Sequence, residues 1–223
     1  MVQRKTKKAV VLLSGGLDSA TTLYYARSKG YELSCLIFDY GQRHRREIIG
    51  ARMLARKAGA RCVLLKISLP WKGSSLLDAK QALPPAVSVR GIPTTYVPAR
   101  NTIFLSFAFS YAEAIGAQSI FIGANALDFS GYPDCRPAYY KVFNSLSRVA
   151  TRTGIEKKPI VVHTPLLHKT KKEIVLLAKR LGVPLALTWS CYQGGRKPCG
   201  KCDSCRLRAK GFAQAGVKDP LSD

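Results

Sequence analysis

The stretch AVVLLSGGLDSATTLYYARSKG, residues 9–30, decides the fold. It begins with an apolar, β-branched run at residues 9–13, continues into the loop SGGLDS at residues 14–19, and ends in a helical pattern that stops at Gly30. This order places the loop at the end of a strand, where ligands bind in open α/β sheets. Two glycines let the backbone approach a phosphate, and two serines and the helix N-terminus supply hydrogen-bond donors for an anion.

The carboxylate in this loop narrows the choice of ligand. Asp18 favours a site for Mg·ATP over a bare anion site, because a carboxylate beside phosphates is repulsive unless Mg²⁺ lies between them. The loop matches neither GxxxxGK[ST] nor GxGxxG, which disfavours a Walker NTPase and a nicotinamide enzyme. The competing interpretation is a glycine-rich turn without a ligand, which the flanking strand and helix disfavour.

The alternation of strands and helices continues along the chain and predicts an α/β protein with a parallel sheet covered by helices. A long irregular segment, residues 68–99, carries five prolines and is predicted to cover the active site. We expect Asn101 or Thr102 to cap the helix that follows it, and Met53 to face inward from its own helix. The other predicted strands are residues 33–38, 62–67, 119–122 and 160–163, and the other predicted helices are residues 44–58, 138–151 and 171–181.

Composition describes an ordinary globular chain with one unusual feature. The 223 residues are 47% hydrophobic and 22% charged, and no apolar run approaches the roughly 20 residues of a membrane helix. We therefore expect a cytoplasmic protein that does not engage a membrane. The net charge of +23 favours anionic partners such as nucleotides, phosphates or RNA, but does not choose among them.

Four of the seven cysteines lie close together, with the spacing C-x7-C-x2-C-x2-C. In a cytoplasmic chain such a cluster favours a metal over disulfides. Four thiolates suit a structural Zn²⁺ site, which has no open coordination position, although a [4Fe–4S] cluster also uses C-x2-C-x2-C. The four are Cys191, Cys199, Cys202 and Cys205.

Several motifs together carry a resemblance to a known family. VVLLSGGLDSATTL resembles the PP-loop of the ATP-pyrophosphatases. Read with the later motifs, nearly the whole chain resembles the QueC family of 7-cyano-7-deazaguanine synthases. Those motifs are FDYGQRH (38–44), TYVPARNTIFL (95–105), IGANALDFSGYPDCRP (122–137), TKKEI (170–174), LGVPLALTWSCY (181–192) and PCGKCDSCRLRAKGFAQAG (198–216).

The resemblance implies a Rossmann-like PP-loop domain over residues 1–187 and a small zinc-binding segment over residues 188–223. It also implies an ATP-dependent carbon–nitrogen ligase that converts 7-carboxy-7-deazaguanine and ammonia to 7-cyano-7-deazaguanine (preQ0), a precursor of queuosine and archaeosine. ATP, Mg²⁺ and one structural Zn²⁺ per chain are the implied cofactors. The implied assembly is a homodimer, with no obligatory nucleic acid, although the net charge leaves weak RNA binding open.

Site residues follow from the motifs. Asp18, Ser19 and Lys171 are the expected catalytic residues, and Lys171 resembles the family's phosphate-contacting lysine. A carboxylate pairs naturally with the guanine edge, so Asp128 or Asp134 is a candidate for the base, with Phe129 or Tyr132 stacking on the ring; their alternative is a role in building turns. Arg136 completes the predicted substrate site. The predicted ATP site is Leu13, Ser14, Gly15, Gly16, Leu17, Asp18, Ser19, Ala20, Asp39, Arg100, Asn101 and Gly123.

Two other functions compete with this interpretation. A PP-loop tRNA-modifying enzyme, of the thiolase or lysidine synthetase type, would use the basic charge to bind the tRNA backbone. GYPDCRP and FDYGQRH do not fit that class. A zinc-ribbon RNA-binding protein without catalysis would leave the SGGLDS loop and a complete α/β domain unexplained.

Overall fold

The computed structural model describes residues 6–42, 45–71, 73–78, 80, 91–127 and 131–222. Five parallel strands form one sheet in the order β3-β2-β1-β4-β5. The strands are β1 (Lys8–Leu12), β2 (Glu32–Asp39), β3 (Arg61–Lys66), β4 (Ser119–Ile122) and β5 (Val161–His163). The predicted parallel sheet is confirmed, with each strand boundary within one residue of its expected position.

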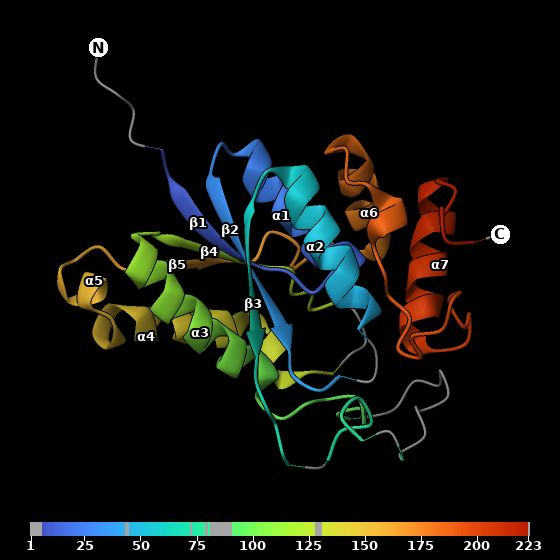
Figure 1. Cartoon of the computed structure of the whole chain (residues 1–223), viewed down its shortest axis with the longest axis horizontal. Helices are drawn as coiled ribbons and strands as arrows, with labels where there is room; N and C mark the ends of the chain where they lie inside the picture. Colours follow the sequence, from blue (N-terminus) through green and yellow to red (C-terminus); the bar gives the residue numbers. More distant parts are fainter. Residues whose placement is uncertain are drawn as a thin grey trace.

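Helices cover both faces of the sheet (Figure 1). On one face lie α1 (Leu17–Ser28), α2 (Arg46–Ala58) and α6 (Lys171–Arg180), and α7 (Asp203–Ala215) packs against the outer side of α6. On the other lie α3 (Arg100–Ile115), α4 (Pro137–Ala150) and the short α5 (Arg152–Ile155). Two 3₁₀ turns, Pro133–Cys135 and Leu185–Leu187, lie in the connections.

Alternation along the central strand explains the two layers. Ala9 and Val11 pack in the core with α1, α2 and α6, whereas Val10 and Leu12 pack in the core with α3 and α4. Successive side chains of a strand point to opposite faces, so a strand buried on both faces is apolar throughout. Phe212 of α7 joins the first of these cores, so the C-terminal helix packs on the sheet domain.

Two local predictions were wrong. Neither Asn101 nor Thr102 caps α3, because the helix already begins at Arg100. Its N-cap position is Ala99, which is in the left-handed region with φ of 51° and provides no side-chain cap. The buried carboxylate of Asp134 instead accepts a hydrogen bond from the Asn101 backbone N–H at 3.0 Å. Met53 points outward and is 46% exposed.

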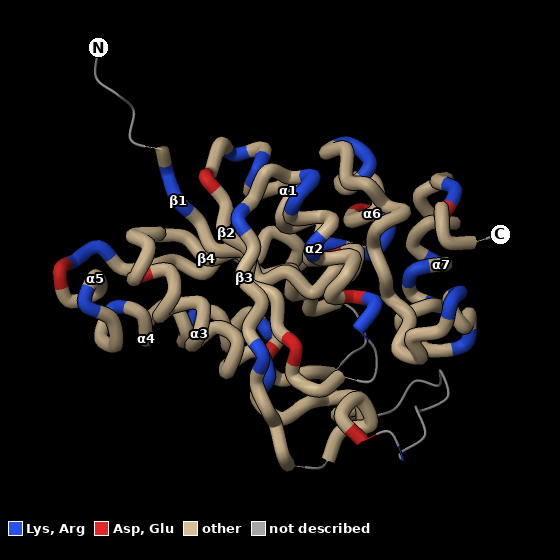
Figure 2. The backbone as a smooth tube through the Cα atoms, in the orientation of Figure 1, with Lys and Arg blue, Asp and Glu red and all other residues tan. Residues whose placement is uncertain are grey.

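Lys and Arg are spread over several helices rather than gathered on one element (Figure 2).

Among the described residues, no helix is long and apolar enough to cross a membrane.

Candidate active site

A cavity of about 670 Å³ lies at the carboxyl ends of the central strands. β1 and β4 are neighbours in the sheet, but the chain leaves β1 toward β2, so this is the point where the strand order reverses. Parallel sheets bind ligands at such a point. The predicted cover contributes to the wall, since Leu76, Gly91, Pro93 and Thr95 line the cavity.

The SGGLDS loop forms one end of the cavity. The Ser19 hydroxyl accepts hydrogen bonds from the Gly15 N–H at 3.2 Å and from the Ser14 hydroxyl at 3.0 Å. Gly15 has φ of +90°, and a Cβ there would lie 2.3 Å from the Glu47 carbonyl oxygen, so only glycine fits. Gly16 precedes α1 without a side-chain cap, and the first turn of that helix lines the cavity. A helix start of this kind favours an anion.

Lys171, at the start of α6, reaches the SGGLDS loop. Its Nζ donates to the two carboxylate oxygens of Asp18 at 3.0 and 2.8 Å. A capping box between Thr170 and Glu173 begins α6 at Lys171. The neighbouring Lys172 is exposed, whereas Lys171 lines the cavity and meets Asp18 there.

The start of α3 forms the opposite wall. The Arg100 guanidinium donates to the Tyr40 hydroxyl at 3.2 Å, and the Tyr132 hydroxyl donates to Thr95 at 2.8 Å. The side-chain amide of Asn101 donates to the backbone carbonyl of Asp134 at 3.1 Å. Arg100, Asn101, Tyr40 and Tyr132 all line the cavity.

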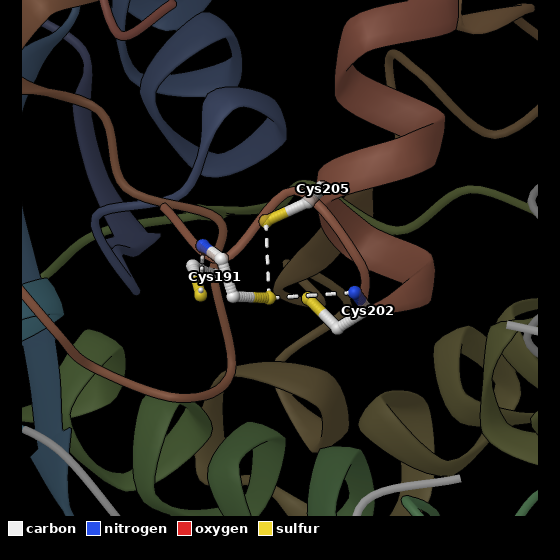
Figure 3. A group of neighbouring side chains, drawn as sticks. Cys191, Cys202 and Cys205 are labelled. Carbon is white, nitrogen blue, oxygen red and sulfur yellow. Dashed lines mark hydrogen bonds between the residues drawn. The ribbon is translucent and has the colours of Figure 1, made fainter. Parts of the chain in front are cut away.

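A second cluster, the four cysteines, lies at the start of α7, next to residues of that helix that line the cavity. The four sulfur atoms lie within 4.8 Å of one another. Cys202 and Cys205 come from the start of α7, and Cys191 comes from the loop before it (Figure 3). Backbone N–H groups of Gln193 and Cys199 donate to the Cys191 sulfur at 3.4 and 3.3 Å. This all-thiol donor set can hold a metal ion with a preference for sulfur ligands.

The loop before α7 that carries Trp189 and Cys191, called the cysteine loop below, is hydrogen-bonded to the SGGLDS loop and to α2. The Trp189 backbone N–H donates to the Gly15 carbonyl at 2.9 Å, and the Trp189 indole donates to the Cys191 carbonyl at 2.9 Å. The Arg46 guanidinium lies over the indole ring, 4.1 Å from its centroid, and donates to the carbonyls of Gly195 and Arg196. The cluster therefore positions Trp189, which lines the cavity.

Comparison with known proteins decides the family. The family model described as "Queuosine biosynthesis protein QueC" matches residues 8–216. The chain belongs to the QueC family. A 7-cyano-7-deazaguanine synthase of Anaeromyxobacter dehalogenans is 53% identical, with 97% of this chain and 95% of that protein covered. One of Thermoplasma acidophilum is 51% identical, with 96% and 91% covered.

Solved structures support the fold of this QueC-family chain. An NMN synthetase from Francisella tularensis has a TM-score of 0.50 at 12% identity, covering 98% of this chain and 90% of that one. A 4-thiouridine synthetase solved as an RNA complex with bound ATP has a TM-score of 0.51 at 20% identity, covering 94% of this chain and 50% of that one. At these identities the likeness concerns the fold alone.

The structure brings most, but not all, of the predicted ligand residues of this QueC-family chain to the cavity. Those that line it are Leu13, Ser14, Gly16, Leu17, Asp18, Ser19, Arg100, Asn101, Gly123, Tyr132 and Lys171. Those that do not are Gly15, Ala20, Asp39, Asp134 and Arg136. Asp39 pairs with Arg45 at 3.5 Å, Arg136 is exposed, and Asp134 is buried at the start of α3. Asp128 and Phe129 lie outside the described residues.

Sequence reasoning missed several residues that line the cavity, above all Glu47. Glu47 lies in the first turn of α2, and burial raises the pKa of its carboxyl to about 7, while the nearby Arg100 guanidinium lowers it. Tyr192, beside the cysteine cluster, also lines the cavity. One signal was available for Glu47: α2 follows β2, so its first turn lies at the same edge of the sheet as the SGGLDS loop.

Proposed function

We propose that this chain is a 7-cyano-7-deazaguanine synthase, which converts 7-carboxy-7-deazaguanine and ammonia to 7-cyano-7-deazaguanine (preQ0) at the expense of ATP. Membership of the QueC family over residues 8–216 carries the proposal. The cavity adds support, because about 670 Å³ is within the range of small-molecule sites and accommodates a nucleotide beside a bicyclic base.

The chemistry requires two activations. The substrate carboxylate attacks the α-phosphorus of ATP, the bond between the α- and β-phosphates breaks, and pyrophosphate leaves. Ammonia attacks the acyl carbon and loses a proton, and AMP departs to give the amide. The amide oxygen then attacks a second ATP with loss of pyrophosphate and one N–H proton. Loss of AMP and the last N–H proton gives the nitrile.

The protein's part is positioning and electrostatic stabilisation at the α-phosphate. In this proposal the SGGLDS loop and the start of α1 hold pyrophosphate, and Lys171 moves from Asp18 to the phosphate. The Lys171 and Asp18 side chains already meet at 2.8 Å at the edge of the cavity. Asp18 is thereby freed to face Mg²⁺, which neutralises phosphate charge when bound.

The cysteine cluster is proposed to hold one structural Zn²⁺. Four thiolates would fill a tetrahedral shell, so the ion would order the loop that carries Trp189 and Tyr192 and would take no part in the reaction. The division at residue 187 belongs to the same proposal, with residues 188–223 as a metal-bearing appendage packed on the sheet domain.

The assembly and location complete the proposal: a cytoplasmic homodimer that takes ammonia from solution or from a partner. Light scattering on a size-exclusion column tests the dimer. The net charge of +23 leaves weak RNA binding open, and a salt titration of RNA affinity tests it. A tRNA-modifying PP-loop enzyme is not favoured, since relatives that cover nearly the whole chain are named as the synthase.

Mass spectrometry tests the reaction directly. Purified protein with 7-carboxy-7-deazaguanine, ammonium and Mg·ATP should yield the nitrile together with AMP and pyrophosphate. Asp18→Ala should abolish the formation of all three products. Metal content is read on the same sample. Absence of turnover in metal-replete protein would refute the proposal, and tRNA would be the next substrate to test.

A further inference from the structure

Two opposite charges lie in the cavity without an ion pair between them. Glu47 from α2 and Arg100 from α3 both line the cavity. They are close enough for the guanidinium to influence the Glu47 carboxyl. Over the described part of the chain, however, no hydrogen bond or ion pair joins the Glu47 carboxyl to any side chain, and the Arg100 guanidinium bonds only the Tyr40 hydroxyl. A charge that is removed from water is costly unless it is fully paired, so this arrangement suits a ligand that supplies a partner to Glu47 and further partners to Arg100.

The other carboxylates that line the cavity face cations other than Arg100. Asp18 is bonded to Lys171 through both oxygens. Asp203 lies at the first turn of α7, beside the cysteine cluster, where the nearby Arg206 acts on its carboxyl. Asp134 does not line the cavity and holds the start of α3. Among the described carboxylates of the cavity wall, Glu47 is therefore the one that the Arg100 guanidinium influences.

Close packing holds Glu47 in place. A Cβ at Gly15 would lie 2.3 Å from the Glu47 carbonyl oxygen, and a Cβ at Gly50 would lie 2.6 Å from the Leu187 carbonyl oxygen. The start of α2 is thus pressed against the SGGLDS loop on one side and the segment before the cysteine loop on the other. Arg46, the preceding residue, bonds the carbonyls of Gly195 and Arg196. A side chain on such a fixed element can discriminate between ligands, because it does not move to follow a wrong one.

We propose that Glu47 reads the base of the substrate by accepting hydrogen bonds from its N1–H and 2-amino group, while Arg100 binds the 6-oxo and 7-carboxylate oxygens. This inference rests on the proposed function, which supplies the substrate. The deazaguanine ring has two donors at one end and two acceptors at the other. A carboxylate matches the first pair and a guanidinium fork the second. The ligand thus joins the two charges that the protein keeps apart.

Binding of this kind changes the protonation of Glu47. Its carboxyl has a raised pKa in the free protein because of burial, and two donated hydrogen bonds favour the ionised form. The groups that face it are Arg100 from α3 and Tyr192 from the cysteine loop. Substrate affinity should therefore increase with pH up to about 7, and binding below that pH should release a proton.

The test compares two ligands on three proteins by isothermal titration calorimetry without ATP. The ligands are 7-carboxy-7-deazaguanine and the analogue that lacks the 2-amino group. The proteins are the wild type, Glu47→Gln and the control Glu156→Gln, whose side chain is exposed and paired with Arg152. Glu47→Gln should weaken substrate binding about 10- to 150-fold, the ratio expected for hydrogen bonds to a charged group. It should affect the analogue much less, so that the selectivity of the wild type collapses.

Kinetics separate this role from others. In Glu47→Gln, the KM for the deazaguanine should rise while the KM for ATP stays at the wild-type value. In the control Glu156→Gln, both KM values should stay at wild-type values. Equal loss for both ligands, unchanged binding, or a defect confined to the ammonia-dependent step would overturn the inference. Selectivity lost in Asp128→Asn but kept in Glu47→Gln would also overturn it. If the wild type turns over the substrate and Glu47→Gln keeps the wild-type selectivity, the inference is refuted and the proposed function stands. If the wild type neither binds nor turns over the substrate, the proposed function is refuted as well.

Discussion

Replacing Glu47 with glutamine should stabilise the ligand-free protein at high pH. Burial raises the pKa of the Glu47 carboxyl from 4.5 to about 7, so the folded state binds a proton more tightly than the unfolded state does. A raised carboxyl pKa costs no stability below about pH 4.5; the cost grows between pH 4.5 and about pH 7 and stays constant above that. The difference between the two pKa values corresponds to about 3 kcal/mol at full ionisation.

Urea unfolding at several pH values measures this effect. The free energy of unfolding of Glu47→Gln should exceed that of the wild type by about 1 kcal/mol at pH 5 and about 3 kcal/mol at pH 8. In thermal unfolding, about 2 kcal/mol of this change corresponds to roughly 4–8 °C for a chain of this size. Any loss of metal at low pH affects both proteins and cancels in the difference.

The control is Glu156→Gln, which removes an exposed carboxylate that pairs with Arg152 at the surface. Its difference from the wild type should stay small and nearly constant with pH, as for most surface ion pairs. A Glu47→Gln difference that does not grow between pH 5 and pH 8 would show that the carboxyl is already paired or solvated in the folded protein. The reasoning about the cavity would then be wrong.

Three further changes test the framework of the site. Gly123→Ala places a Cβ 2.8 Å from the Asp18 backbone carbon, so we expect about 1–3 kcal/mol of destabilisation and weaker ATP binding, measured by urea unfolding and calorimetry. Asp219→Ala removes the carboxylate that pairs with Arg208, which is 4% exposed, and so leaves a buried charge without its counter-ion. The free energy of unfolding in urea should fall by about 3–5 kcal/mol. Asp219→Asn, which keeps hydrogen-bonding groups at this position, should lose less. Cys202→Ser should lower bound metal well below that of the wild type, as measured by inductively coupled plasma mass spectrometry, and a wild-type metal content would contradict the four-sulfur site.

The fold could be predicted from the sequence because its determinants are local. The strands are short runs with apolar centres, several helices such as α2, α4 and α6 have an apolar periodicity, and the SGGLDS loop marks the first crossing between strand and helix. Cysteine spacing predicted that four thiols would meet, and the structure brings their sulfurs within 4.8 Å. Met53 is an exception, because the face of α2 that packs on the sheet is narrower than the apolar pattern suggested.

The part of the cavity near Arg100 was harder to predict because it depends on long-range contacts. Asp134 has the chemistry of a base-reading carboxylate, but the Asn101 N–H, 33 positions earlier, takes one of its oxygens. Glu47 has the same chemistry and appeared in the sequence as one acidic residue in a basic helix. The order of β2 and α2 places its helix start at the right edge of the sheet, but the folded structure is needed to show that Glu47 lines the cavity. Residue type was a fair guide to what the site needs, but not to which residue supplies it.

Other contacts connect the cysteine cluster with the SGGLDS end of the cavity. Trp189 bonds the Gly15 carbonyl and the Cys191 carbonyl, so one residue joins the SGGLDS loop to the cysteine loop. Arg46 packs on the Trp189 ring and bonds the cysteine loop, next to Glu47 in the chain. A metal that orders this loop would therefore act on both ends of the cavity without touching the substrate. Loss of the metal should weaken binding of ATP and of the base together, which is the expected signature of a positioning role and not of a catalytic one.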